Sequence, residues 1–266
     1  MRNVEHISTL DDPRIAPYRS LKDRDLAREG ARFIAEGELV VRRLLMSDYP
    51  VESVLLAERR AQEIAPLVPD AVPVYVAPDP LVHLIVGFKF HSGVIACGRR
   101  KLASKLDEVA SRLGSRATLV VCPDIANTDN LGSLMRIAAG FGADAMILGP
   151  QCCDPFYRQA IRVSMGAVFQ LNLFQSTDLR RDLARLRDES HVQLVATVVD
   201  DDAAEDLQSA RRAERIALMF GNEAQGLPGD LLQICDRRIT IPMNLGTDSL
   251  NVSVAAAVFL YHFTRR

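Results

Sequence analysis

The chain has 266 residues, of which 48% are hydrophobic and 25% are charged, as is typical of a globular protein with one or two domains. Its formal net charge of -2 excludes a generally polycationic protein, so any surface that attracts nucleic acid must be local. No stretch approaches the roughly eighteen consecutive apolar residues of a membrane span, and we expect no signal peptide.

Residues 1–100 mix helical and strand-like patterns. A helix is predicted over Leu21–Met46. Short apolar runs predict strands at Val51–Leu56, Val72–Val76 and Ser92–Cys97. These elements indicate a small α/β domain.

A basic segment follows this domain. Between Arg99 and Arg116 there are six basic residues and two acidic ones. We expect residues 101–116 to form a basic, largely helical linker. Such a segment is either a solvated helix face or a local surface for nucleic acid.

Residues 117–266 alternate between strand-like and helix-like segments. Strands are predicted at Thr118–Cys122, Ala145–Leu148, Val168–Phe174, Gln193–Val199, Ile216–Phe220 and Arg238–Ile241. Helices are predicted at Asn130–Ala139, Pro155–Met165, Leu179–Glu189, Pro228–Cys235 and Ser249–Tyr261. This alternation predicts a parallel sheet with helices on both faces, and ligands of such sheets bind beyond the carboxyl ends of the strands.

The last helix, Ser249–Tyr261, is almost wholly apolar, so we expect it to be buried on all sides and capped by Ser249. Asn251 and Ser253 lie in its first turn. A buried amide or hydroxyl costs about 1–3 kcal/mol without a partner. The backbone, another chain or a ligand must therefore satisfy these groups.

Three loops at the carboxyl ends of predicted strands combine glycine with polar residues. In the first, Asp129 or Asn130 is expected to cap a helix, and Arg136 lies in an apolar stretch, where it should point into a cleft or pair with an acid. In the second loop, Gly221 precedes Asn222 and Glu223. The third leads from Pro242 into Ser249. Each loop alone fits an ordinary turn, whereas the three together predict one composite site.

Other signals are negative. The five histidines and five cysteines show no metal-ligand spacing, so no metal is expected, and the odd number of cysteines indicates free thiols in a reducing cytoplasm. Residues 140–145 resemble a dinucleotide-binding glycine pattern, but they follow a helix and precede a strand, which is the reverse of the required order.

The three loops resemble the three signature motifs of the SpoU (TrmH-like) family of RNA ribose 2′-O-methyltransferases in the SPOUT superfamily. The matching segments are Asn130–Arg136, Phe220–Leu227, and Ile241–Met243 with Ser249–Ala255. Ala224 stands where many members have glycine. Residues 1–100 more loosely resemble the small RNA-binding domain that often precedes this one, through Phe33–Gly37 and His91–Val94.

The resemblance implies an α/β fold in which residues 117–266 form a SPOUT domain with a parallel sheet and a deep trefoil knot, preceded by an RNA-binding α/β domain. It also implies a homodimer and the cofactor S-adenosylmethionine, which Gly221, Ile241 and Leu250 would contact, largely through their backbones.

The catalytic residues implied by the resemblance are Asn130, Arg136, Glu223, Ser249 and Asn251. An arginine with a pKa above about 12 is a poor general base. We therefore expect Arg136 to bind a substrate phosphate, and either that phosphate or a deprotonated guanidine takes the proton. Asn130 and Asn251 would orient Arg136 and the ribose, while Glu223 and Ser249 would hold this network.

We therefore predict methyl transfer from S-adenosylmethionine to a ribose 2′-hydroxyl of structured RNA, with rRNA favoured over tRNA. DNA is excluded because it lacks this hydroxyl, and no membrane partner is expected. One alternative is a non-catalytic RNA-binding or ribosome-assembly protein, which the five intact polar motif positions disfavour. The other is a nucleotide-binding α/β enzyme, which the reversed glycine order and the missing phosphate loop disfavour.

Overall fold

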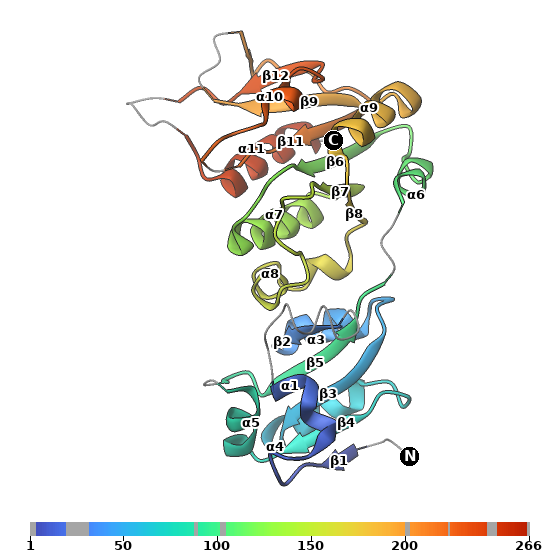
Figure 1. Ribbon diagram of the computed structural model, residues 1–266, viewed down its shortest axis with the longest axis vertical. Helices are drawn as coiled ribbons and strands as arrows, with labels where there is room; N and C mark the ends of the chain where they lie inside the picture. The colour runs from blue at the N-terminus through green and yellow to red at the C-terminus, as the bar shows by residue number, and fades with distance from the viewer. Residues whose placement is uncertain are drawn as a thin grey trace. The chain divides into compact units, whose positions relative to one another are not determined.

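The computed structural model describes residues 4–19, 32–87, 90–101, 105–199, 203–222, 224–243 and 249–264. The chain forms two compact units. Unit 1 contains Met1–Leu102 and Pro155–Gln170, and unit 2 contains Ala103–Asp154 and Leu171–Arg266. Figure 1 labels most of the helices and strands of both units. No helix among the described residues is long and apolar enough to cross a membrane.

Unit 1 is built on a five-stranded sheet of order β1-β4-β3-β5-β2. Its strands are β1 (Val4–His6), β2 (Arg32–Glu36), β3 (Val51–Ala57), β4 (Val74–Ala77) and β5 (Val94–Arg99). β1, β4 and β3 run parallel, whereas β5 runs antiparallel to β3 and β2. The helices of its first segment are α1 (Ala16–Arg19), α3 (Glu38–Leu45), α4 (Glu58–Ile64) and α5 (Asp79–Val86).

The predicted helix over Leu21–Met46 is wrong for part of its length. Residues 20–31 lie outside the described residues, Arg32–Glu36 form β2, and only Glu38–Leu45 are helical. Three consecutive residues of β2 are buried, as in a strand covered on both faces, and such a run looks alike in a helix and in a strand. Gly37, whose φ of +96° favours glycine, separates the strand from the helix.

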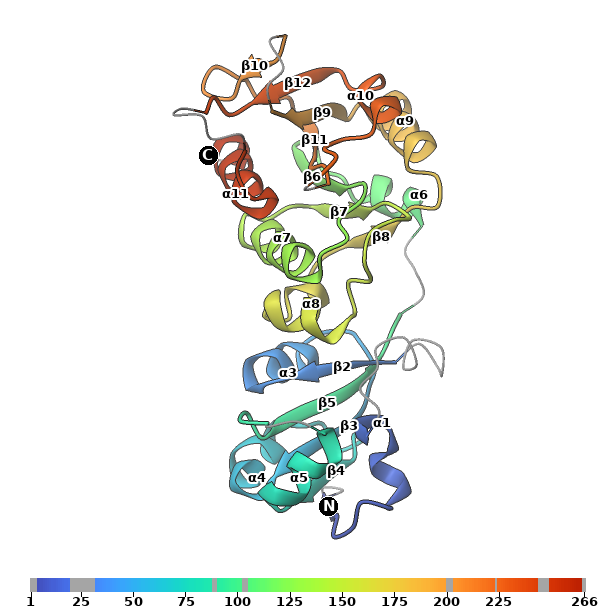
Figure 2. The ribbon, with the colours of Figure 1, turned by 60° about the vertical axis from the view of Figure 1, so that its left-hand side comes forward.

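Unit 2 is built on a seven-stranded parallel sheet of order β10-β12-β9-β11-β6-β7-β8 (Figure 2). Its strands are β6 (Ala117–Cys122), β7 (Ala145–Leu148), β8 (Leu173–Gln175), β9 (Gln193–Val198), β10 (Glu205–Asp206), β11 (Arg215–Met219) and β12 (Arg237–Thr240). The helices are α6 (Leu106–Ser111), α7 (Thr128–Gly140), α9 (Leu179–Ser190), α10 (Gly229–Leu232) and α11 (Val252–Thr264).

The predicted parallel α/β sheet is confirmed. All residues of β6 and β7 are buried, which explains their uninterrupted apolar sequences. β11 lies between β6 and β9, and β12 lies beyond β9, so the carboxyl ends of β9, β11 and β12 meet at one edge. α11 packs against α7 near this edge (Figure 2). The deep trefoil knot stays a prediction.

Residues 155–170 differ from the sequence prediction. The expected helix Pro155–Met165 shortens to α8 (Arg158–Val163), and the first part of the expected strand Val168–Phe174 is a 3-10 helix, Ala167–Phe169. Both belong to unit 1. The rings of Phe156 and Phe169 lie 5.3 and 5.4 Å from the ring of Phe33 in β2, so apolar residues that resemble a strand instead pack as an aromatic cluster.

The basic segment is less helical than predicted. Only Leu106–Ser111 form a helix, and residues 102–104 lie outside the described residues. Arg99 belongs to β5 and pairs with Glu52, while Lys101 lies 3.5 Å from Asp48. Part of its positive charge is therefore held by neighbouring acids.

Candidate functional site

A cavity of about 530 Å³ opens at the carboxyl ends of β9, β11 and β12 and is bordered by the start of α11. It lies where ligands of parallel sheets bind. Its lining includes five of the residues predicted from the motifs, namely Gly221, Ile241, Ser249, Leu250 and Asn251. The second motif, 220–227, and both parts of the third, 241–243 and 249–255, therefore contribute to one hollow, whereas no residue of the first motif is in its lining.

The cavity also includes Thr197, Val198 and Val199, which follow β9 and which the motifs did not indicate. These residues carry no charged group or glycine that marks a site. Their signal was topological, because β9 was a predicted strand of the same parallel sheet and its carboxyl end had to lie at the same edge.

The loop after β11 is a tight, cross-linked turn. Asn222 and Gly226 exchange both backbone hydrogen bonds at 2.9 Å. The Asn222 side chain accepts from the backbone N–H of Ala224 and donates to the carbonyl of Asp124 over 3.1 Å. A Cβ on Gly221 would lie 2.4 Å from the carbonyl carbon of Gly226, so only glycine fits at this position. The turn therefore holds its backbone firmly at the cavity wall.

The replacement of glycine by Ala224 causes no backbone strain. The positive φ of this turn falls on Gly226, at +69°, and Ala224 is not among the described residues with positive φ. Glu223, assigned to the network at this turn, lies outside the described residues.

Asn127, rather than the predicted Asp129 or Asn130, caps α7. Its Oδ1 accepts from the backbone N–H of Asp129 over 2.8 Å and from that of Asn130 over 3.2 Å. Asparagine and aspartate both cap helices well, and the helix begins two residues earlier than predicted, at Thr128. The cap fixes Asn130 within the first turn of α7.

Asn130 and Asn251, from motifs far apart in the sequence, are in direct contact. Nδ2 of Asn251 donates to Oδ1 of Asn130 over 3.0 Å. Oδ1 of Asn251 accepts from the backbone N–H of Ser253, so Asn251 caps α11 and the predicted cap Ser249 does not. The backbone thus supplies one of the partners that the sequence required for these polar groups.

Arg136 does not line the cavity. Its side chain is exposed on α7 and makes no ion pair with any described residue, contrary to the expectation that it points into a cleft or pairs with an acid. An exposed guanidinium without a protein counter-charge can receive an anion from outside the chain.

α11 is buried on one face only in the single chain. Ala256, Phe259, Leu260 and Phe263 are buried, whereas Val254, Val258 and Tyr261 are 49%, 39% and 52% exposed. These three follow the i, i+4, i+7 spacing of one helix face, so they form an apolar stripe. Such exposed stripes mark interaction surfaces.

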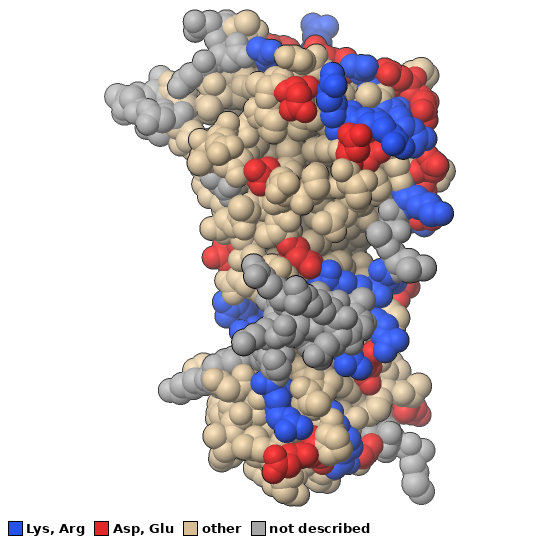
Figure 3. Space-filling model, viewed as in Figure 1, with Lys and Arg blue, Asp and Glu red and all other residues tan. Residues whose placement is uncertain are grey.

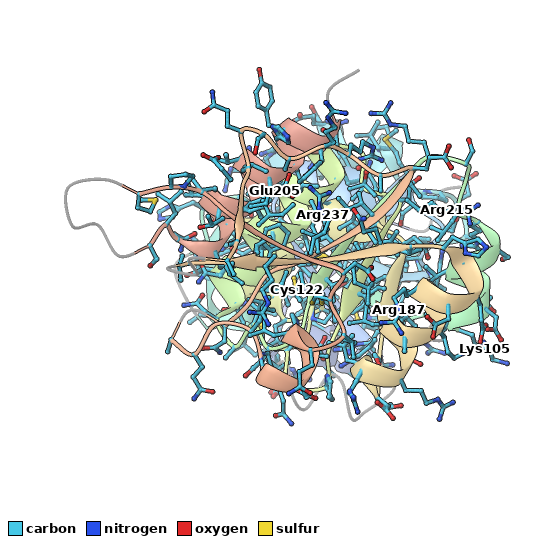
Figure 4. The ribbon with its side chains drawn as sticks, turned by 90° about the horizontal axis from the view of Figure 1, so that it is seen from above. Lys105, Cys122, Arg187, Glu205, Arg215 and Arg237 are labelled. Carbon is cyan, nitrogen blue, oxygen red and sulfur yellow. The ribbon has the colours of Figure 1, made fainter. Side chains whose placement is uncertain are left out.

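A second, open hollow lies where β9, β10 and β12 begin. Arg237 lies beside Glu205 in Figure 4 and pairs with it. The Arg237 guanidinium also donates to Gln193 Oε1 over 3.1 Å and to the carbonyl of Arg211 over 2.7 Å. Its charge and donors are therefore used within the fold, which makes this hollow a poor anion site.

Charges on unit 2 alternate in sign where they can be seen around α9. Blue and red side chains are interspersed there in Figure 3. The sequence of α9 carries Arg180, Arg181, Asp182, Arg185, Arg187, Asp188 and Glu189. Within the described residues, no group of three His, Cys, Asp or Glu side chains could hold a metal ion.

A family model described as the SpoU rRNA methylase family matches residues 117–261. The chain belongs to this family. The match begins with β6 and ends within α11, so it spans the whole sheet of unit 2. The family resemblance drawn from the three motifs is confirmed.

Relatives of this SpoU family chain extend the likeness to unit 1. A protein of Mycobacterium bovis named an uncharacterized tRNA/rRNA methyltransferase is 37% identical, over 99% of this chain and 92% of its own length. A 23S rRNA (guanosine-2′-O-)-methyltransferase of Acinetobacter baylyi is 30% identical, over 79% of this chain and 85% of its own. The SpoU family chain is an RNA methyltransferase.

A solved structure has the same fold. The AdoMet-bound rRNA methyltransferase of Sinorhizobium meliloti superimposes with a TM-score of 0.83, at 24% identity, over 98% of this chain and 97% of that one. The likeness covers both units and shows the fold.

Proposed function

We propose that the protein transfers a methyl group from S-adenosylmethionine to a ribose 2′-hydroxyl of structured RNA, with rRNA favoured over tRNA. The observation that carries the proposal is the 3.0 Å hydrogen bond from Asn251 to Asn130, because it joins two motifs beside a cavity that a third motif also lines. The Acinetobacter relative, named as a 23S rRNA 2′-O-methyltransferase, supports the choice of the ribose and of rRNA.

The cavity suits the cofactor. Its volume of about 530 Å³ is within the usual range for small-molecule sites, roughly 300–1,000 Å³. Val198, Phe220, Ile241 and Leu250 offer apolar surface to a flat base, and Gly221 allows the backbone to approach it closely. When bound, S-adenosylmethionine supplies an activated methyl carbon.

Arg136 fits the binding of an RNA phosphate. It is exposed and not paired with a described acid, and a guanidinium can bind two phosphate oxygens at once. Holding the phosphodiester there would fix the neighbouring ribose, and orientation of the reacting groups is itself a large contribution to rate. The proton of the 2′-hydroxyl would pass to this phosphate or to a deprotonated Arg136. Ser249 and Glu223 would complete the network around Asn130 and Asn251.

We propose a homodimer in which a second copy covers the apolar stripe of α11. The stripe ends at Tyr261, whose ring packs edge-on against that of Phe141 at 6.4 Å, so aromatic surface continues beyond the helix. Residues 1–100 and the basic linker 101–116 would supply RNA affinity, and residues 117–266 would carry the catalysis. The free cysteines support a cytoplasmic location.

The test is mapping of ribose methylation in total RNA from cells with and without the gene. We expect one 2′-O-methyl mark to vanish in the deletion and to return with the intact protein but not with Arg136→Ala. An unchanged map, together with purified protein that binds no S-adenosylmethionine, would favour the non-catalytic RNA-binding alternative.

A further inference from the structure

Two loops at the carboxyl ends of neighbouring strands are joined to each other: residues 123–127 after β6 (the β6 loop) and residues 149–153 after β7 (the β7 loop). The backbone N–H of Gly149 donates over 2.8 Å to the carbonyl of Cys122, the last residue of β6 (Figure 4). A Cβ on Gly149 would lie 2.1 Å from the carbonyl oxygen of Pro123, so only glycine allows the two backbones to approach this closely.

The side chain of Cys152 fastens the same two loops. Its Sγ donates to the carbonyl of Cys122 over 2.9 Å and accepts from the backbone N–H of Ile125 over 3.3 Å. A carbonyl can only accept and an N–H can only donate, so these contacts need the protonated thiol. The backbone N–H of Cys153 donates to the carbonyl of Ile125 over 2.9 Å. The β7 loop therefore binds both backbone polar groups of Ile125.

The β6 loop in turn supports the turn that lines the cavity. The carbonyl of Asp124 accepts from Nδ2 of Asn222 over 3.1 Å. The oxygen of the same amide accepts from the backbone N–H groups of Ala224 and Gln225, over 2.9 and 3.2 Å, so the Asn222 side chain also closes its own turn. Asn222, Ala224 and Gln225 all line the cavity. Hydrogen bonds therefore connect Cys152 to the cavity wall.

The contacts of Cys152 and Asn222 meet on a single peptide group. The carbonyl of Asp124 and the N–H of Ile125 belong to one planar unit, in which they point in opposite directions. Cys152 Sγ binds its N–H end, and Asn222 Nδ2 binds its C=O end. Rotation of this peptide would break both hydrogen bonds at once, and bonds joined in such a chain strengthen each other.

We propose that Cys152 is a positioning residue for the cofactor: its thiol fixes the peptide between Asp124 and Ile125, and this peptide holds the cavity turn in the form that binds S-adenosylmethionine. The inference rests on the proposed function. A turn that is already ordered loses less conformational freedom when a ligand binds, so the affinity is higher. Without the thiol the peptide is held at one end only, and the turn must be ordered when the cofactor binds.

The experiment measures the Kd of the intact chain for S-adenosylmethionine by calorimetric titration. Cys152→Ala removes the donor and the acceptor, and we expect the Kd to rise about fivefold, the net weight of one hydrogen bond. Cys152→Ser keeps a donor and an acceptor at this position and should return the Kd to within about twofold of the wild type.

The matched control is Cys235→Ala. The Cys235 thiol also donates to a backbone carbonyl, that of Leu231 over 3.0 Å, but Cys235 is not among the described residues that line the cavity. This variant should keep the wild-type Kd. If Cys152→Ala lowers only the melting temperature and matches this control in Kd, the thiol has a structural role, and the inference fails while the proposed function stands.

Asn222→Asp tests whether the effect passes through the shared peptide. The carboxylate still accepts from the N–H groups of the turn but no longer donates to the carbonyl of Asp124. In this background Cys152→Ala should change the Kd by less than about twofold, because the connection has already been lost. Additive effects of the two substitutions would overturn the inference.

Alkylation with iodoacetamide separates this local connection from a general change in stability. By linkage, a cofactor that prefers the fixed peptide also keeps Cys152 in its hydrogen bonds. Saturating S-adenosylmethionine should therefore slow the labelling of Cys152 and leave that of Cys235 unchanged, as measured by mass spectrometry. Equal rates at Cys152 with and without the cofactor would contradict the inference. If the wild-type protein binds no S-adenosylmethionine, the proposed function fails and the inference fails with it.

Discussion

In the parallel sheet of unit 2, the edge at which the strands begin (the amino edge) and the edge at which they end (the carboxyl edge) use polar residues in opposite ways. At the edge where the strands begin, arginine side chains bind backbone carbonyls. Arg212 donates to the carbonyl of Phe263 over 2.7 Å, Arg215 to that of Ser190 over 2.7 Å, and Arg237 to that of Arg211. At the carboxyl edge, a glycine turn and an asparagine pair border a cavity, and Arg136 is exposed on the helix that starts there.

The difference teaches that the contacts of an arginine, and not its presence, mark a binding site. Burial lowers the pKa of Arg212. Its hydrogen bonds to Thr118 Oγ1 and to two backbone carbonyls offset the cost of burying the guanidinium. These donors close the amino edge and tie α11 to it. Arg136 has no such partner among the described residues, so its donors remain available to a ligand.

The largest expected effect comes from Arg136→Ala. Loss of the phosphate-binding guanidinium should lower kcat/KM about 100-fold, while the melting temperature stays within about 2 °C because the side chain is exposed. Methyl transfer and thermal unfolding are measured on the same sample. Arg180→Ala, an exposed arginine on α9, is the control. Near-normal turnover in Arg136→Lys would rule out bidentate binding.

Arg212→Ala should lower the stability of the fold and leave cofactor binding unchanged. It leaves the carbonyls of Ala117 and Phe263 without their donor, so we expect the free energy of unfolding to fall by about 2–3 kcal/mol. The folded fraction should keep its Kd for S-adenosylmethionine. Urea denaturation measures the loss, again with Arg180→Ala as control. An unchanged urea midpoint would show that the hydrogen bonds of Arg212 do not stabilise the fold.

Gly221→Ala probes the carboxyl edge alone. The added Cβ must displace the backbone of Gly226 or Leu227, so we expect the Kd for S-adenosylmethionine to rise about tenfold, equivalent to about 1.4 kcal/mol. Calorimetric titration measures it. Gly229→Ala is the matched control, because nothing lies within 4 Å of its added Cβ. Equal affinities for the two variants would place the cofactor away from this turn.

The smallest effect is a difference in salt dependence. RNA binding weakens as salt rises, and Arg136→Ala should reduce the slope of log K against log salt by about 0.7–0.9, the weight of one phosphate contact. The destabilisation caused by Arg212→Ala should not depend on salt, because its hydrogen bonds are part-buried. Filter binding and urea denaturation at matched salt concentrations provide the comparison. If the slope for Arg136→Ala equals that of the wild type, Arg136 makes no contact with an RNA phosphate.

The sequence predicts the framework of unit 2 well because its strands are fully covered. The strand at Ala145–Leu148 has the predicted bounds, and that at Thr118–Cys122 begins one residue earlier, since central parallel strands give uninterrupted apolar runs between polar loops. The same reasoning fails for β2. Its three buried residues are followed by a true helix, and local periodicity does not separate the two.

The site is predictable only in part, for similar reasons. Motifs indicated Asn130 and Asn251, and the structure joins them. The cap of α7 could not be chosen from sequence, because Asn127, Asp129 and Asn130 all accept hydrogen bonds well. Thr197 lines the cavity because of the place of β9 in the strand order, and no local sequence pattern indicates that order.

Residues 155–170 have a consequence for the exchange of domains between related genes. They lie between β7 and β8 in the sequence, yet Phe156 and Phe169 pack on Phe33, and Arg43 donates to the carbonyl of Met165 over 2.6 Å. A single crossover after residue 102 would therefore join a foreign first domain to a segment evolved for a different partner. Productive recombination has to carry both pieces together, so these two parts of the gene are expected to be inherited as one.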